Sequence, residues 1–506
     1  MKTKILLLSL LTTTLVSCNS YFSGMDVKNE FEPDIEAVMG DINQYPSLLG
    51  GGYSNWWSHM LYNDGNTWCL ATNADAYTAG AGNWNLRTFT YYAGYDKPEI
   101  ANTDQNGDFP RVFWYNQYGK INTVRNMLTL IKDKDLVYKQ SGEDATYKIL
   151  ANCYFLMGAY YTELALLFDK SFILTEETVT DDITAADINS ADKVQELALS
   201  YLDKCIQICN EKTFDNFEGL LPSNVIANSE GLKRMAKFMA ARALAYFPRT
   251  NGETVDWNRV LTYANEGLTE DIKAVLPLQG FDVGSLAVYG YEKADQWVRV
   301  NMRVVNMMAK NDPNAPWPLP SDFLQDQTLP EATSPDYRLG TDFIYYPNPD
   351  SPSGGMSYRG YQYYSPYVLK RFAETGQPSG AGNLYLFMKA ESDLLKAEAL
   401  LNTNKKNEAI PLINITREGR GKLNDITTTS TDAEVLEAIY YERFVECGYA
   451  YAGTPFYDRR RTPIDKFQLA TRSFREWPIP IMELAFYDID SYTFGGAPDR
   501  NDKYKF

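Results

Sequence analysis

The sequence predicts a mainly α-helical protein, in which a tetratricopeptide-like scaffold of paired helices carries long irregular loops. Three observations lead to this fold class. Apolar residues recur at helical spacing in successive segments of the chain. Several connections between these segments are short, which favours antiparallel pairs, and pairs too small to bury their own apolar faces stack as repeats. Two other regions, about 50–95 and 270–380, lack this periodicity.

The clearest helix covers about residues 191–209, and two more follow it closely. Its apolar side chains recur every three or four positions, which places them on one face, and Ser190 is expected to cap its first turn. The next helix runs over about 231–247 and ends before Pro248, and a third begins after Asp256. These three segments predict stacked, antiparallel helices.

Similar segments lie on both sides of these helices. In the last of them, Thr431 and Glu434 have the spacing of a capping box. No strict repeat of 34 residues is visible, so we expect degenerate repeats. The segments cover about residues 111–131, 144–168, 384–402, 406–418 and 432–447.

The two regions without periodicity are rich in glycine, asparagine, proline and aromatic residues. Loops of this length are usually functional or disordered. Their high aromatic content favours ordered loops that lie on the helical scaffold. The glycines at 50–52 are followed by no lysine that could meet a phosphate, so they predict a hinge or a tight turn.

The first eighteen residues resemble a bacterial lipoprotein signal. Lys2 and Lys4 precede an apolar run from Ile5 to Val16, which is too short to span a membrane, since a span needs about 20 residues. The run ends in Leu-Val-Ser-Cys, a lipobox that would make Cys18 the acylated first residue of the mature chain. We expect a signal peptide over 1–17, a tether over 18–33 and a helical domain over 34–506. The alternative is an ordinary secretory signal.

Composition limits the classes of function. The net charge of −17 disfavours nucleic acid as a partner. His59 is the only histidine, so a catalytic triad or a histidine metal cluster would depend on it, and we predict no catalytic residue, no metal and no cofactor. Cys205 and Cys209 share a helical face and are expected to be buried apolar residues. Asp104, Asn106 and Asp108 match part of a calcium loop, but a solvated turn fits them better.

Several segments together resemble the SusD/RagB family, the surface lipoproteins of nutrient-uptake systems in Bacteroidetes. Each segment is weak alone, but their order along nearly the whole chain is specific. Two places depart from the family pattern, namely Gly158, where the family often has arginine, and the turn at 169–172. The segments are the lipobox, 113–121, 159–168, 387–399, 414–417, 441–448 and 477–480 with Glu483.

This resemblance implies a tetratricopeptide-type scaffold with one ligand surface built from loops. It also implies a SusC-type TonB-dependent transporter as partner and an outer-membrane location, lipid-anchored and facing the cell exterior. A protein of this kind captures a glycan or a peptide and delivers it to the transporter without catalysis.

Within the two irregular regions, aromatic and polar side chains suggest a binding platform. Aromatic rings stack on the apolar faces of sugars while amides, carboxylates and guanidinium groups bind their hydroxyl rims. Core packing remains the alternative for any one tryptophan, including Trp56. The predicted ligand-binding residues are Trp57, Trp68, Asp75, Asn83, Trp84, Asn85 and Arg87 in the first region and Tyr289, Tyr291, Trp297 and Tyr364 in the second.

Paired acids raise a rival function, a glycoside hydrolase on a helical scaffold. Glu442 and Glu446 share one helical face, and Glu391 and Asp393 share one approximately with Glu398. For these acids we expect salt bridges on exposed helix surfaces, with Arg443, Lys389 or Lys396 as partners. The basic run at 459–461 is likewise expected to pair with carboxylates. The predicted function is glycan capture; a peptide-binding member of the same family, a glycoside hydrolase and a structural surface protein are the alternatives.

Overall fold

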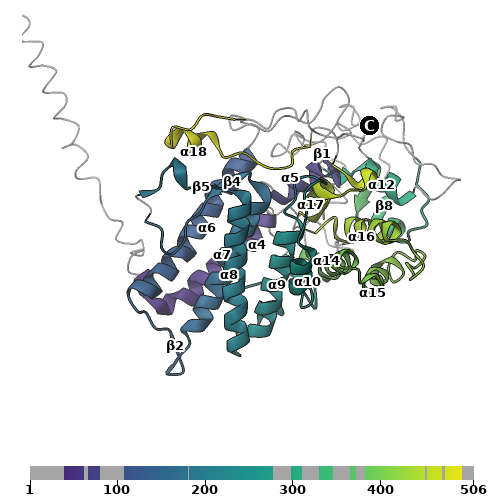
Figure 1. The fold of residues 1–506 in the computed structure, drawn as a ribbon. Coiled ribbons are helices and arrows are strands. Elements are labelled where there is room, and N and C mark those ends of the chain that lie inside the picture. Colours follow the sequence, from purple (N-terminus) through teal and green to yellow (C-terminus); the bar gives the residue numbers. More distant parts are fainter. Residues whose placement is uncertain are drawn as a thin grey trace, which may run out of the picture.

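The computed structural model describes ten stretches of the chain, most of them helical (Figure 1). The statements below concern these stretches alone. They are residues 39–61, 66–79, 108–179, 182–276, 298–309, 330–345, 365–371, 382–450, 453–469 and 473–492.

An array of long helices forms the scaffold, and each helix contacts the next (Figure 1). Antiparallel helices of this kind bury their apolar stripes against both neighbours, which is the packing of a helical repeat. The mainly α, tetratricopeptide-like fold predicted from the sequence is therefore confirmed. The array consists of α6 (Asp108–Asp133), α7 (Thr146–Leu167), α8 (Ala191–Glu211), α9 (Ser229–Ala245), α10 (Trp257–Ala264), α14 (Lys389–Asn402), α15 (Lys406–Arg417) and α16 (Asp432–Cys447).

Six further helices of the described stretches lie outside this array. Two of them precede it, two follow α10, and two follow α16. They are α4 (Tyr45–Leu61), α5 (Asn66–Asn73), α12 (Met302–Ala309), α13 (Arg338–Thr341), α17 (Thr454–Arg461) and α18 (Ile481–Phe486). Single turns of 3-10 helix lie at Ile42–Gln44, Ala185–Asp187, Asn224–Ile226 and Asp465–Phe467.

The most buried helix of the array is α7, whose side chains are covered on nearly every side. It packs most closely against α8, and Gly158 is the reason. A Cβ at position 158 would lie only 2.6 Å from Cγ of Leu202 and 3.1 Å from the carbonyl oxygen of Ala198. The missing side chain therefore lets α7 and α8 approach each other.

Five two-stranded antiparallel sheets connect or cap the helices. Their pairs are β1 (Tyr77–Ala79) with β7 (Val298–Val300), β2 (Lys139–Gln140) with β3 (Glu143–Asp144), β4 (Lys170–Phe172) with β5 (Ile188–Ser190), β6 (Ile272–Leu276) with β10 (Gly382–Phe387), and β8 (Phe343–Tyr345) with β9 (Tyr367–Leu369). The β10–β6 register shifts between Tyr385 and Phe387. The sequence suggested helix from about residue 384, but the chain is extended until Phe387.

The predicted irregular region at 50–95 is wrong in its first part. Residues 45–61 form α4 and residues 66–73 form α5, so the glycines at 50–52 lie inside a helix. Gly52 allows a close approach between α4 and α7, because a Cβ there would lie 3.0 Å from Leu156 and the Tyr160 hydroxyl donates to the Gly52 carbonyl at 3.0 Å. Gly52 therefore serves the packing of α4 against α7, and the predicted hinge or tight turn at 50–52 is wrong. The region at 270–380 also contains regular elements, namely β6, β7, α12, α13, β8 and β9.

Details of capping and of the core agree with most expectations. Thr431 and Glu434 form the predicted capping box at the start of α16. Ser190 does stand at the N-cap of α8, but its side chain makes no capping hydrogen bond, so that prediction is wrong. All five described cysteines are buried, Cys205 and Cys209 included. No helix in the described stretches is long and apolar enough to cross a membrane.

Candidate functional site

Four short strands, β1, β7, β8 and β9, form a strand junction beside α12 and α16 (Figure 1). Ala79 pairs with Val298, and Tyr345 pairs with Tyr367. The hydroxyl of Ser365 donates to the carbonyl oxygen of Val300 at 2.6 Å, which joins the two pairs. Three stretches outside the described part have an end at this junction: residues 80–107 begin after Ala79, residues 277–297 end before Val298, and residues 346–364 run from Tyr345 to Ser365. Both predicted ligand-binding regions are therefore attached to this junction.

Asp75 lies just before β1 and is part of the support of the junction. Its φ of 55° is in the left-handed region, which aspartate tolerates better than most residues. The carboxylate is buried and forms an ion pair with Arg303 at 3.1 Å. Arg303 also donates to the backbone carbonyl of Gln468 at 2.6 Å. The predicted ligand contact for Asp75 is thus wrong, because its side chain faces a buried guanidinium rather than solvent.

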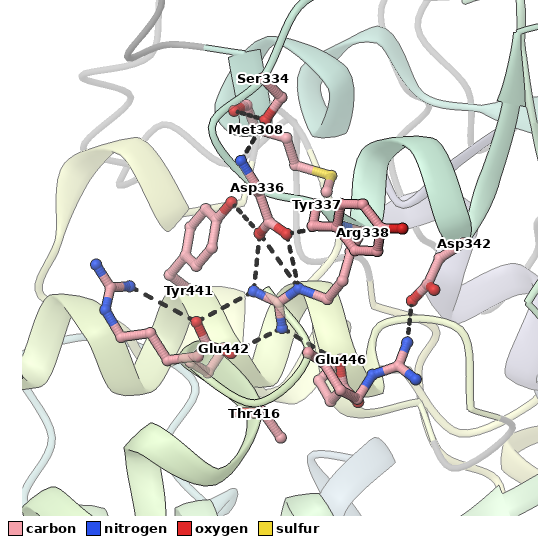
Figure 2. Close-up of polar contacts among 12 residues, drawn as sticks. Met308, Ser334, Asp336, Tyr337, Arg338, Asp342, Thr416, Tyr441, Glu442 and Glu446 are labelled. Atoms are coloured by element: carbon pink, nitrogen blue, oxygen red, sulfur yellow. Dashed lines mark hydrogen bonds and ion pairs between the residues drawn. The ribbon is translucent and has the colours of Figure 1, made fainter. Parts of the chain in front are cut away.

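Next to the junction lies a compact set of eight charged side chains, here called the Arg338 cluster (Figure 2). Figure 2 shows Arg338 between Asp336 and Glu442. Its guanidinium donates to Asp336 at 2.9 Å, to Glu442 at 2.7 Å and to Glu446 at 3.2 Å. The cluster balances four arginines against four acids: Arg338, Arg371, Arg417 and Arg420 with Asp336, Asp342, Glu442 and Glu446.

Glu446 of α16 holds the end of the β8–β9 pair at which β8 begins and β9 finishes. Arg371, which follows β9, donates to a carboxylate oxygen of Glu446 at 2.7 Å. Arg420 contacts the same oxygen at 2.8 Å and also pairs with Asp342, which precedes β8. The backbone amide of Arg371 donates to the Asp342 carbonyl at 3.0 Å. The start of β8 and the end of β9 are therefore held against one helix.

Glu442 and Glu446, the two acids of α16 in this cluster, have pKa values shifted in opposite directions. Burial raises the pKa of Glu442 despite the neighbouring Arg338. Burial also acts on Glu446, but Arg371, Arg420 and Arg338 outweigh it, so the pKa of Glu446 is lowered. Opposite shifts are a feature of the acid and base of glycosidases. Here, however, arginines occupy every carboxylate oxygen of both residues, and both side chains are buried.

The prediction of surface salt bridges for these acids was right about ion pairing and wrong about place and partners. Glu442 and Glu446 are buried, and their partners come from segments far away in the sequence. Glu398 does pair with Arg443, at 2.7 Å, but inside the core. Lys389 pairs with Asp393 one turn later on α14. Buried ion pairs need good geometry because both charges lose their hydration.

The basic run at the end of α17 pairs with carboxylates only in part. Arg461 contacts Glu398 and Asp458, both at 2.7 Å. Arg459 and Arg460 instead donate to backbone carbonyls, Arg460 to those of Leu166 and Tyr246 at 2.7 Å. Leu166 and Tyr246 lie at the ends of α7 and α9, where carbonyl groups lack partners within the helix. Arg460 thus caps the ends of two helices.

Of the predicted platform residues, few lie where the structure describes their side chains. Trp57 is half-buried and packs against the core. Trp56 is fully buried, and its indole nitrogen donates to Glu163 at 2.9 Å, so core packing is its role. Trp68 belongs to α5, and His59 to α4, but their side chains are outside the described part of the chain. Asn83, Trp84, Asn85, Arg87, Tyr289, Tyr291, Trp297 and Tyr364 lie outside the described residues, as do Cys18 and Asp104.

Sequence reasoning missed the Arg338 cluster and the support it gives to the strand junction. Asp336, Arg338 and Asp342 lie in a segment without periodicity, and Arg338 is 104 residues from Glu442. No local spacing could therefore have revealed the contact. Across the described residues, no group of histidine, cysteine or acidic side chains could hold a metal ion.

Comparison with known proteins finds solved structures with a similar fold. No protein-family model and no curated protein matches the sequence. Among solved structures, a SusD-like protein from Bacteroides fragilis is similar, with a TM-score of 0.61 and 14% identity over 91% of this chain and 98% of that chain. A SusD superfamily protein from Bacteroides vulgatus has a TM-score of 0.61 and 15% identity over 90% of this chain and 99% of that one.

A third structure, described as a SusD-like carbohydrate binding protein from Bacteroides vulgatus, has a TM-score of 0.54. It is 15% identical and covers 82% of this chain and 83% of its own. At such low identity, the agreement concerns the arrangement of helices and strands. The chain has the SusD-like fold, the fold of the family that its sequence resembles.

Proposed function

We propose that the protein is a SusD-family lipoprotein of the outer membrane that binds an oligosaccharide or polysaccharide at the cell surface and delivers it, without catalysis, to a SusC-type TonB-dependent transporter. The observation that carries this proposal is the SusD-like fold, since similar structures include proteins described as carbohydrate binding. The strand junction adds to it, because both aromatic-rich regions are attached there.

Ligand contacts are assigned to the aromatic and polar residues of these two regions. Rings stack on the C–H faces of sugars, and flanking amides and a guanidinium bind the hydroxyl rims. Asp75 and Trp56 are excluded because they are buried. The assigned residues are Trp57, Trp68, Asn83, Trp84, Asn85, Arg87, Tyr289, Tyr291, Trp297 and Tyr364.

The location follows from the first residues of the chain. In this proposal, residues 1–17 are removed, Cys18 carries the lipid and residues 18–33 separate the membrane from a domain that begins near residue 34. A short acylated tether keeps the binding surface close to the transporter, which raises the effective concentration of the two partners.

Calorimetric titration of the protein without its signal peptide tests this function. The ligand panel contains neutral polysaccharides, acidic polysaccharides and peptides. We expect a neutral glycan to bind, and the Trp84→Ala and Trp297→Ala variants each to weaken it about fivefold, the loss of roughly 1 kcal/mol of ring contact. The matched control is Phe486→Ala, an exposed aromatic on α18, which should bind the glycan normally.

Other results would overturn the proposal. Binding of peptides alone would assign the protein to the peptide-binding alternative. New reducing ends that disappear after substitution of a single glutamate or aspartate would show a glycoside hydrolase. Failure to bind any member of the panel would leave a structural surface protein.

A further inference from the structure

Helix α18 turns two large apolar side chains outward. Met482 and Phe486 are 65% and 79% exposed, the highest values among the large hydrophobic residues of the described chain. They are four positions apart and therefore share one face of the helix. Leu484, between them, is buried and anchors the helix to the core. The buried Leu484 therefore holds α18 in place, with Met482 and Phe486 on its exposed side.

Residues from other elements extend this surface. Tyr115 of α6 is 42% exposed, and burial together with the nearby Glu483 carboxylate raises the pKa of its hydroxyl. The ring of Tyr487 lies 4.9 Å from that of Phe486 and 5.0 Å from that of Phe172 in β4. We call Tyr115, Met482, Phe486 and Tyr487 the α18 face. It lies at the end of the helix array beside β4 and β5, away from β1 and β8 (Figure 1).

The clustering distinguishes this face from ordinary surface residues. Single exposed apolar side chains are normal, whereas a contiguous group marks an interaction site. Of seven exposed large hydrophobic residues in the described chain, three belong to the α18 face. The others, including Val137 and Val179, belong to separate segments.

Charges around the face select among possible occupants. Among the described residues, Asp187, Glu483, Asp488 and Asp490 lie on or near it, against Arg111 and Lys170, and Lys170 is paired with Asp169. A second copy of the chain would bring acids against acids in an isologous contact. Phosphate-bearing lipid headgroups would also be repelled. A protein surface with an apolar centre and a rim of lysine or arginine is complementary.

We propose that the α18 face docks a protein partner whose apolar contact surface is rimmed by basic side chains. Its identity as the TonB-dependent transporter rests on the proposed function. Met482 and Phe486 supply the desolvated centre of the contact, and the acids accelerate and orient the encounter.

The test measures binding of the purified transporter, in detergent, to the unmodified full chain and to three variants of it. A Met482→Ala/Phe486→Ala double variant is expected to bind at least about tenfold more weakly. Asp490→Lys should slow association and reduce its dependence on salt. The matched control is Val137→Ala/Val179→Ala, which removes two exposed apolar side chains elsewhere and should bind as the unmodified protein does.

Glycan titration with the same variants separates this inference from the proposed function. The α18 double variant should keep its full glycan affinity while it loses the transporter. Unchanged transporter binding would overturn the α18 face and leave the proposed function intact. A protein that binds glycan but no transporter would overturn both the partner and the face. Sedimentation showing a dimer that the double variant loses, or binding to phosphatidylglycerol vesicles, would show a different occupant and overturn the proposal.

Discussion

Lys120 is the residue whose charge conflicts most with its position. Its side chain is buried in the helix array, with the ammonium 5.5 Å from the ring centre of Tyr160 and 5.9 Å from that of Phe113. Burial lowers the pKa of Lys120 to about 8, although the charge of Glu163 opposes this. Burial also raises the pKa of Glu163. The cation is therefore held at a cost in folding free energy.

Lys120→Met is expected to stabilise the protein at pH 7 by about 1 to 3 kcal/mol, because the lysine pKa falls from 10.5 to about 8 on folding. Between these pH values the unfolded chain binds the proton that the folded protein has lost, so the stability of the unmodified protein rises with pH. The advantage of the variant should shrink as the pH approaches 10.5. Urea unfolding of both proteins from pH 7 to 10 measures it.

The control for this prediction is Lys193→Met, an exposed lysine on α8, whose effect should be small and independent of pH. If Lys120→Met were less stable than the unmodified protein at pH 7, attraction to Glu163 would outweigh the loss of hydration.

Arg338 presents the opposite case, a buried cation with a full set of partners. Arg338→Met would leave Asp336, Glu442 and Glu446 buried beside each other without their shared guanidinium. Removal of one partner from a buried ion pair typically costs about 3 to 5 kcal/mol. We expect a loss of that size in the free energy of unfolding, measured in urea at pH 7. The loss should be smaller near pH 4, because burial raises the pKa of Glu442 and this carboxylate can take up a proton there.

The comparison is Lys132→Met, which removes one half of the exposed Lys132–Glu177 pair and should change stability by less than about 1 kcal/mol. Equal effects of the two substitutions would mean that water reaches the Arg338 cluster.

At the scale of elements, the α7–α8 contact depends on the absence of a side chain at position 158. Alanine is a better helix former than glycine by about 1 kcal/mol. A methyl group at Gly158, however, would lie 2.6 Å from Leu202, and overpacking of a core usually costs about 1 to 3 kcal/mol. Gly158→Ala should therefore destabilise the protein by up to about 2 kcal/mol in thermal or urea unfolding.

Gly119 provides the matched control, because it lies exposed in α6 and a Cβ added there would meet no atom within 4 Å. Gly119→Ala should stabilise the protein by up to about 1 kcal/mol. Adding Leu202→Ala to Gly158→Ala should remove most of the clash. A stable Gly158→Ala protein would show that α8 can shift without loss.

Helices were predictable where a stripe of apolar residues faces the core. In α8, Val194, Ala198, Leu202 and Cys205 are buried as their spacing requires. The pattern fails for α4, where three consecutive glycines and polar neighbours hide the periodicity. It also fails at β10, because a short extended segment before α14 carries the same apolar residues as a helix start. In both segments, tertiary contacts rather than the local pattern determine the secondary structure.

At the scale of the whole molecule, helical periodicity, short connections and the family resemblance led to the fold, but the contacts between distant segments could not be deduced from them. The buried role of Asp75 depends on Arg303, which is 228 residues away. The Arg338 cluster likewise joins α16 to a segment far from it in the chain. The α18 face combines Tyr115 with Met482 and Phe486, and no local pattern links residues so distant. Sequence spacing reports neighbours within one element, whereas these sites exist only after the elements pack.

Glu446 fixes the start of β8 and the end of β9 with contacts that do not involve the chain between Tyr345 and Ser365. The protein therefore separates what must be kept from what can vary. Substitutions or insertions between Tyr345 and Ser365 would leave the ion pairs around Glu446 in place. New ligand specificities can therefore evolve on the same fold.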